Sequence, residues 1–380
     1  MFDRHLSMIE CKLKTNIARI AFPELKYILI LFFSTRIILT LIAVLSRVLL
    51  EPYHRKEDYW IYSDKLWLDI WGVWDTGWYL GIAANGYSAV ASLGDQANYN
   101  FFPLYPLLMR LLGYVTEDNY LSGIIISNIA LLVSCVFLYK LVELDENSDT
   151  AMRSIKFLFL FPTAFILSGV FTESLFLALL LACFYYARKG NWFLVGVLGF
   201  CLSLTRAIGV LIIMPILYEY LKSKTISRDI LCLLLIPSGI FVWMVFNFFL
   251  TGDFLAFMHI QSAWGRSLAD PLLTIYNGLF ATDLVKVFEA FFAIISLSIL
   301  ILFYNKIRTS YWIFGMFALI TPLLTSIDSM PRYALVVFPF FILFAQLTKE
   351  RPINDVLTII LALLQGCLMI FWSNGFTLII

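Results

Sequence analysis

The chain has 380 residues, of which 61% are apolar and only 14% are charged, and its mean hydropathy is +0.87. Because a soluble chain of this length carries about 25% charged residues, the composition excludes a water-soluble domain. The net charge of +1 provides no basic surface for a nucleic-acid partner. The long apolar runs instead predict an all-α polytopic membrane protein.

The apolar runs predict about eleven membrane-spanning helices. Several of those between 155 and 221 are short, so re-entrant or broken helices are an alternative there. We expect one membrane domain over residues 1–380, with a large first external loop at 51–120 and a second at 251–285. The predicted spans are 26–50, 121–142, 155–170, 173–187, 192–206, 207–221, 229–250, 286–304, 310–326, 331–348 and 355–377.

The distribution of basic residues predicts the orientation of these spans. With the N-terminus in the cytoplasm, the inner segments hold 17 of the 27 lysines and arginines, as the positive-inside rule requires. Loop 51–120 then lies outside with four basic and nine acidic residues. We expect the C-terminus outside and only ordinary solvated charge in the cytoplasmic loops.

The first external loop contains a tryptophan pattern that is typical of a surface helix. Trp67, Trp71, Trp74 and Trp78 are spaced four, three and four residues apart, so they fall on one face of an amphipathic helix. Tryptophan favours the headgroup level, so we expect this helix to lie along the outer membrane surface. Asp75 is costly there unless its carboxylate faces a cavity or a partner.

Two arginines lie within the first apolar run. Arg36 is deep enough to pair with a carboxylate in the bundle or to approach a lipid ligand, whereas Arg47 is expected to extend to the outer interface. The six cysteines have neither metal-ligand nor disulfide spacing. There is also no DxD triplet and no histidine-rich set, so we expect neither a metal nor a cofactor.

Six motifs fall at the outer ends of the predicted spans or in the outer loops: WDTGWYLGIAANGY (74–87), NFFPLYPLLMR (100–110), GVFTESLF (169–176), LTRAIGVL (204–211), QSAWGRSL (261–268) and SMPRYALVVFP (329–339). In this order they resemble the PIG-V-like mannosyltransferases, the family of the enzyme that adds the second mannose to GPI anchors. That family belongs to the GT-C class of membrane glycosyltransferases.

The resemblance implies a GT-C bundle with surface-lying helices in the first external loop, a catalytic aspartate in that loop and a lipid-phosphate-linked sugar donor. The chain departs from the family in two places. An Asn-Gly pair often follows the family's arginine, whereas Ala207, Ile208 and Gly209 follow Arg206 here. The family also tends to have an acidic residue before FFPLYP, for which Asp95 is the candidate.

The residues on this face also suit the chemistry of glycosyl transfer from a lipid phosphate. This reaction needs a base for the acceptor hydroxyl and positive charge for the departing phosphate. Asp75 is the candidate base. The candidate donor-phosphate ligands are Arg206, Arg266, Arg332 and His259, and the candidate sugar or acceptor contacts are Trp74, Tyr105, Glu173, Gln261, Trp264 and Tyr333.

Structural alternatives remain for three of these residues. Glu173 also fits a role in capping a helix N-terminus, and His259 also fits a structural hydrogen bond. Arg332 also fits an anchor at the membrane interface. The functional hypothesis is an inverting transfer of a hexose, with mannose as the first candidate, from a polyprenyl-phosphate donor to a glycolipid or glycan acceptor. We expect the plasma membrane of a prokaryote rather than the endoplasmic reticulum. A non-catalytic pathway subunit and a secondary transporter are the alternatives.

Overall fold

The computed structural model describes residues 22–50, 61–91, 95–223 and 226–379. Within these ranges the chain forms helices joined by turns, and no strand occurs there. Residues 1–21, including Cys11, and residues 51–60 of the first loop lie outside the described residues. The all-helical part of the fold prediction is therefore confirmed for the described residues.

Five of the described helical segments are long and apolar enough to cross a membrane. Their apolar side chains are exposed on outward faces, which a lipid environment accommodates. Together with the similarity described below, they identify an integral membrane protein. These segments are α2 (Phe22–Leu49), α6 (Asn119–Asp145), η5 (Arg228–Leu234) with α11 (Leu235–Thr251), α14 (Leu284–Leu302) and α18 (Arg351–Ser373).

The remaining predicted spans also fall on helices, but these are short or interrupted. The predicted span 155–170 covers the last part of α7 and a following 3-10 turn. The predicted span 207–221 begins with another 3-10 turn, so the broken-helix alternative describes both spans. The count of eleven spans stays a prediction. The shorter elements are α7 (Ser148–Leu160), η3 (Ala164–Ser168), α8 (Glu173–Arg188), α9 (Trp192–Ser203), η4 (Ala207–Ile212), α10 (Ile213–Ser223), η7 (Tyr304–Lys306), α15 (Thr309–Leu323), α16 (Met330–Leu335), α17 (Pro339–Leu347) and η8 (Thr377–Ile379).

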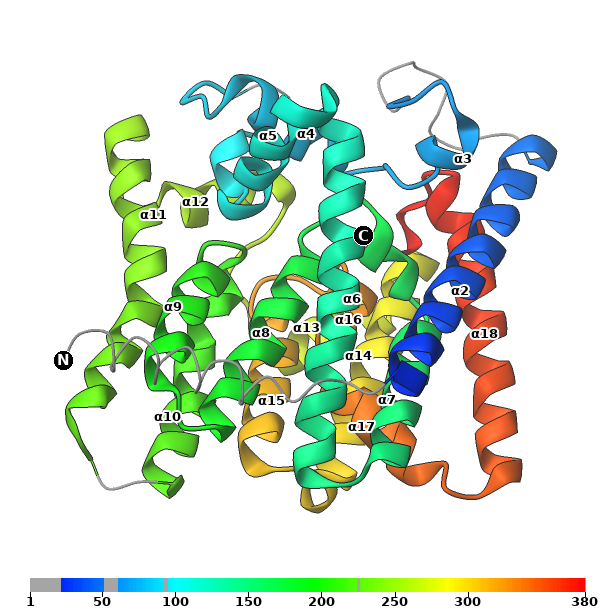
Figure 1. Cartoon of the computed structure of the whole chain (residues 1–380). Helices are drawn as coiled ribbons and strands as arrows, with labels where there is room; N and C mark the ends of the chain where they lie inside the picture. Colours follow the sequence, from blue (N-terminus) through cyan, green and yellow to red (C-terminus); the bar gives the residue numbers. More distant parts are fainter. Residues whose placement is uncertain (1–21, 51–60, 92–94, 224–225, 380) are drawn as a thin grey trace.

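The two loops predicted to be external form short helices, and those of the first loop lie at one end of the bundle, at the top of Figure 1. We refer to this end as the loop end. The first loop contains α3 (Leu66–Asp69), α4 (Thr76–Asn85), η2 (Asn98–Asn100) and α5 (Leu104–Thr116). The second contains α12 (Ala256–His259), η6 (Ile260–Trp264) and α13 (Pro271–Leu279).

The prediction of one continuous helix over 67–78 with the tryptophans on one face is wrong. Helix α3 ends at Asp69 and α4 begins at Thr76, with Trp74 between them in a left-handed conformation (φ 51°). The chain is tightly packed at this break, because a Cβ on Gly72 would lie 2.6 Å from the Tyr120 ring. The tryptophans therefore do not share one helix face.

Arg47 anchors the first loop to the bundle, so the prediction that it extends to the interface is wrong. Its guanidinium bonds to Asp69 at 2.5 Å, and both side chains are almost fully buried. Arg36 also finds no carboxylate among the described residues. Its Nη1 donates to Ser168 Oγ at 2.7 Å and to the carbonyl of Ala164 at 3.2 Å, which ties α2 to the broken segment η3.

The opposite end of the bundle contains a half-buried ion network rather than the ordinary solvated charge that we expected. Arg308 bonds to Glu219 at 3.1 Å and to Asp145 at 3.3 Å, and Arg188 also pairs with Asp145. The Tyr311 hydroxyl donates to Asp145 at 2.7 Å. This network joins α6, α8, α10 and α15, so it closes the bundle at this end.

Candidate active site

The six sequence motifs meet at the loop end of the bundle. The backbone N–H of Leu104, in the FFPLYP motif, donates to the Leu204 carbonyl of the LTRAIG motif at 3.0 Å. The amide of Gln261 donates to Asn100 Oδ1, which joins the second loop to the first. Segments that are 161 residues apart in sequence are thus in direct contact, as their common position at helix ends and in outer loops predicted.

Four charged side chains from four of these motifs form one connected network. Arg332 Nη1 donates to Asp75 Oδ2 at 2.6 Å, and its Nε donates to Glu173 Oε1. Arg206 Nη1 donates to the same Glu173 oxygen at 2.6 Å. The Glu173 side chain is 0% exposed and that of Asp75 is 21% exposed. Asp75 is therefore the carboxylate of this network that a ligand can reach.

Aromatic rings hold both guanidinium groups in place. The Arg332 guanidinium lies 4.7 Å from the centre of the Phe171 ring, and that of Arg206 lies 5.3 Å from the centre of the Tyr333 ring. A guanidinium remains charged in such a position because it is weakly hydrated and interacts favourably with an aromatic face. The rings thus fix the direction of the remaining N–H donors.

Arg266 adds a third guanidinium beside this network without a carboxylate partner among the described residues. Its Nη1 lies 3.3 Å from Gln261 Oε1 and 3.5 Å from the Tyr333 hydroxyl. The neighbouring Tyr333 hydroxyl group raises the pKa of Arg266, and this effect outweighs the opposite effect of burial. Three guanidinium charges against two carboxylates leave the cluster with one net positive charge, which favours an anionic ligand.

Both members of the Asp75–Arg332 pair follow a residue in a left-handed backbone conformation. Trp74 has φ 51° and directly precedes Asp75, and Ser329 has φ 69° and immediately precedes the helix that carries Arg332. Such conformations cost about 1–3 kcal/mol each for residues other than glycine, and they persist where the surrounding structure enforces them. Strain of this kind is typical of functional sites.

Three buried polar atoms at the network lack a hydrogen-bond partner among the described residues. They are the hydroxyls of Thr76 and Thr172 and the second carboxylate oxygen, Oε2, of Glu173. Buried polar groups are usually satisfied by protein or by water. These atoms therefore mark a place where water or a hydroxyl-bearing ligand has partners to bind, and neither threonine was among the predicted site residues.

The capping alternative for Glu173 is only partly realised. Glu173 is the first residue of α8, where a negative charge favours the helix dipole, but the preceding Thr172 makes no side-chain cap bond. The carboxylate is instead directed to the two arginines. Its observed role is thus to hold the arginines together.

The remaining predicted contact residues lie in three different environments. Trp264 forms an aromatic wall with Trp78 and Phe101, whose ring centres are 6.0 and 6.1 Å away. Trp74 packs against the main apolar core. Tyr105 is fully buried, and its hydroxyl bonds to Ser127 at 2.8 Å, so it packs between helices and does not face an open space.

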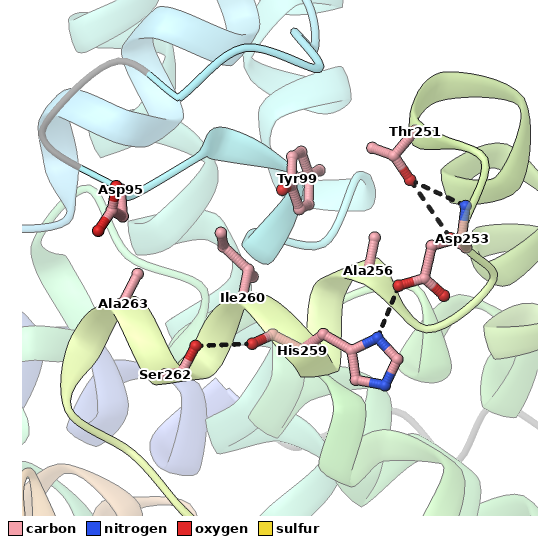
Figure 2. Close-up of a pocket in the computed structure, with 9 residues that line it drawn as sticks. All are labelled: Asp95, Tyr99, Thr251, Asp253, Ala256, His259, Ile260, Ser262 and Ala263. Atoms are coloured by element: carbon pink, nitrogen blue, oxygen red, sulfur yellow. Dashed lines mark hydrogen bonds and ion pairs between the residues drawn. The ribbon is translucent and has the colours of Figure 1, made fainter.

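His259 does not touch the charged network and lines a separate pocket of about 450 Å³ (Figure 2). Its Nδ1 lies 2.6 Å from Asp253 Oδ2, and Asp95 lines the same pocket. The Leu255 backbone N–H and, next, His259 lower the pKa of Asp253. With two carboxylates, this pocket is unsuited to a phosphate. In the described part of the chain, no cluster of three or more histidine, cysteine or acidic side chains is arranged to hold a metal.

One buried carboxylate near the site was missed by the sequence reasoning. Glu289 of α14 is 1% exposed and accepts a hydrogen bond of 2.6 Å from the backbone N–H of Ser329. It belongs to no motif. A single acidic residue within an otherwise apolar predicted span was the only signal available.

Comparison with known proteins shows which solved structures have a similar fold. No protein-family model and no curated protein matches the sequence. The structure is similar to ArnT from Cupriavidus metallidurans bound to undecaprenyl phosphate, with 12% identity and a TM-score of 0.53, over 87% of this chain and 62% of that one. An oligosaccharyltransferase from Archaeoglobus fulgidus, in complex with zinc and sulfate, matches with 12% identity and a TM-score of 0.46, over 90% of this chain and 53% of that one.

This chain therefore spans about three fifths of the length of ArnT. ArnT is a GT-C glycosyltransferase, and the similarity to it supports the GT-C fold. At this level of identity the similarity concerns the fold alone. The assignment to the PIG-V-like family and the roles of the site residues remain proposals.

Proposed function

We propose that this protein is a membrane glycosyltransferase that transfers a hexose from a polyprenyl-phosphate donor to a glycolipid or glycan acceptor. The observation that carries the proposal is the network of Asp75, Arg332, Glu173 and Arg206 at the loop end of a GT-C bundle. It combines a reachable carboxylate with arginines held in fixed directions. ArnT, which shares the fold, was solved bound to undecaprenyl phosphate, and this supports the class of donor.

The arginines are proposed to bind the donor phosphate. Arg332 donates hydrogen bonds from Nε and Nη1 to the two carboxylates, and Arg206 donates one from Nη1 to Glu173. Each guanidinium therefore keeps N–H donors for a ligand. Arg266 has no carboxylate to compete with the ligand. A guanidinium binds phosphate oxygens in pairs, so these groups can neutralise the charge that develops as the phosphate leaves. His259 is not included, because its pocket is acidic.

In the proposed step, Asp75 acts as general base. The acceptor hydroxyl oxygen forms a bond to the anomeric carbon while its proton passes to the Asp75 carboxylate. The bond between that carbon and the phosphate oxygen breaks, and the electron pair leaves with the polyprenyl phosphate. Such proton transfer contributes about 10²–10⁴ to the rate.

A direct, inverting displacement is favoured over a double displacement. Retention through a covalent intermediate needs a second carboxylate as nucleophile. Glu173 is the candidate, but it is fully buried and bonded to two arginines. Its engagement supports a positioning role. We further propose that the sugar is mannose, that the protein is related to the PIG-V-like family and that it lies in the plasma membrane of a prokaryote. All three parts rest on the motif resemblance.

The position of the charges favours this function over transport. A transporter would place its binding charges near the bilayer midplane, between broken helices. Here the reachable carboxylate, Asp75, lies between the short helices α3 and α4 of the first loop. Intact pairing of Asp75 likewise supports a catalytic protein rather than a non-catalytic subunit.

The test is transfer by the purified protein in lipid nanodiscs, with radiolabelled polyprenyl-phosphate mannose, glucose and galactose and a membrane-lipid extract as acceptor. We expect transfer with one of these donors, and Asp75→Asn should lower the rate by about 10²–10⁴. Asp253→Asn, an exposed aspartate at the same end, is the matched control and should keep the parent rate. Transfer by Asp75→Asn at more than a tenth of the parent rate would refute the assignment of the base.

A further inference from the structure

Glu289 holds the beginning of the short helix that carries Arg332 and Tyr333. Its Oε1 accepts the backbone N–H of Ser329 at 2.6 Å, and Ser329 has the left-handed φ of 69°. The Ser329 carbonyl in turn accepts the backbone N–H groups of Arg332 and Tyr333, both at 3.0 Å. The backbone conformation of Ser329, whose N–H is held by Glu289, thus directs the carbonyl that begins the first turn of α16.

The hydrogen bonds that fix the turn at Ser329 are buried and come from distant parts of the chain. Glu289 lies on α14 and is 1% exposed, and its second oxygen has no partner among the described residues. The Pro331 carbonyl accepts a hydrogen bond of 3.0 Å from the Thr163 hydroxyl, in the turn between α7 and η3. A left-handed serine persists only where its surroundings enforce it, and these contacts provide that enforcement.

We propose that Glu289 is a positioning residue for Arg332, which it places by fixing the left-handed turn at Ser329. This inference rests on the proposed function for its effect on activity. Glu289 touches neither Asp75 nor Arg332 and acts through the backbone alone. The feature that matters is therefore an oxygen acceptor at this position, and negative charge is not required.

Two substitutions at position 289 separate the acceptor from the charge. Glu289→Gln keeps an oxygen for the Ser329 N–H, so donor KM and kcat should stay close to the parent values. Glu289→Leu removes the acceptor, and a misplaced guanidinium should lower kcat/KM for polyprenyl-phosphate mannose by about 10- to 100-fold, with the acceptor KM unchanged. Equal losses in both variants would overturn the inference.

A second substitution tests the turn itself. Glycine adopts a positive φ without strain, so Ser329→Gly should partly restore both the unfolding temperature and the donor KM of Glu289→Leu. Glu117→Gly is the matched control. Glu117 also has a positive φ of 57°, but it ends α5 and does not contact Glu289, so its replacement should restore neither quantity. Equal recovery by both glycines, or by neither, would overturn the inference.

The unfolding temperature and the kinetics distinguish the failure of this inference from the failure of the proposed function. If the parent protein transfers no sugar and undecaprenyl phosphate does not raise its unfolding temperature, the proposed function fails. The thermal coupling between positions 289 and 329 still tests the hold on the turn. If that coupling is present but Glu289→Leu transfers sugar with the parent donor KM, the positioning role is overturned while the proposed function stands.

Discussion

At the scale of single residues, the three arginines of the site have different partners and should respond differently to removal. Arg332 is bonded to both Asp75 and Glu173, whereas Arg266 bonds only to neutral groups. Removing one partner of a buried pair leaves an uncompensated charge, which is strongly destabilising. Removing a cation without a carboxylate partner leaves no such charge behind.

We therefore expect Arg266→Ala to lower donor use by about 10- to 100-fold, the usual effect of one lost charge-assisted contact, with an unchanged unfolding temperature. Arg332→Ala should lower both donor use and the unfolding temperature, because buried Glu173 loses a partner. Arg332→Lys should recover only part of the activity, since a point charge replaces a planar fork. Donor kinetics and thermal unfolding measure the two effects separately.

Arg351→Ala serves as the control for these variants, because its side chain is 93% exposed and lies at the start of α18. It should change neither quantity. Near-normal donor use by both Arg266→Ala and Arg332→Ala, in folded protein, would place the phosphate site elsewhere.

The sequence allowed these arginines to be selected because each lies in a motif at the outer end of a predicted span or in an outer loop. Such segments meet on one side of a helical bundle. It could not reveal how they divide their partners, since the sharing of Glu173 between Arg206 and Arg332 depends on side-chain directions. Glu289 stayed hidden for a related reason, because its partner is a backbone N–H and no sequence pattern records that bond.

At the scale of elements, the turn that carries Arg206 depends on close packing at Gly209. Arg206 directly precedes η4, and a Cβ on Gly209 would lie 2.4 Å from the Leu202 carbonyl oxygen. The Leu202 carbonyl belongs to helix α9, so it has no room to move away from an added side chain. Any side chain at position 209 therefore displaces η4 from α9, and Arg206 moves with it.

We expect Gly209→Ala to lower both the unfolding temperature and transfer activity, the latter by about tenfold or more, because small displacements at a reacting site are costly. Gly81→Ala is the matched control. Gly81 lies within α4, and a Cβ there meets nothing within 4 Å. The alanine should raise stability by about 0.5–1 kcal/mol with activity unchanged. Full activity in Gly209→Ala would contradict the close packing.

The hydrophobicity of the sequence predicted which segments form helices better than it predicted where those helices are interrupted. Apolar runs located the helices, but they did not reveal where tertiary contacts interrupt them. The stripe from Trp67 to Trp78 fits a helix by spacing, yet Trp71 is buried and its carbonyl accepts the Val170 N–H at 3.2 Å. Bonds of this kind join distant segments and override local periodicity.

At the scale of the whole molecule, the two ends of the bundle differ in how their charges are satisfied. At one end, Arg308, Arg188, Glu219 and Asp145 neutralise one another and join four helices. At the loop end, the cluster keeps a net positive charge, a reachable carboxylate and unpartnered hydroxyls. One end is thus closed by its own charges, and the other is prepared for an anionic ligand.

The last prediction concerns the membrane side on which that ligand binds. The positive-inside bias predicts that the loop end lies outside the cytoplasm. Ser88, exposed just after α4, and Ser223, exposed at the end of α10, lie near opposite ends of the molecule and report on the two sides. In a background without native cysteines, Ser88→Cys should react with a membrane-impermeant maleimide in intact cells. Ser223→Cys should react only after the membrane is opened. The reverse pattern would place the candidate active site in the cytoplasm, and labelling of both from outside would contradict the predicted threading itself.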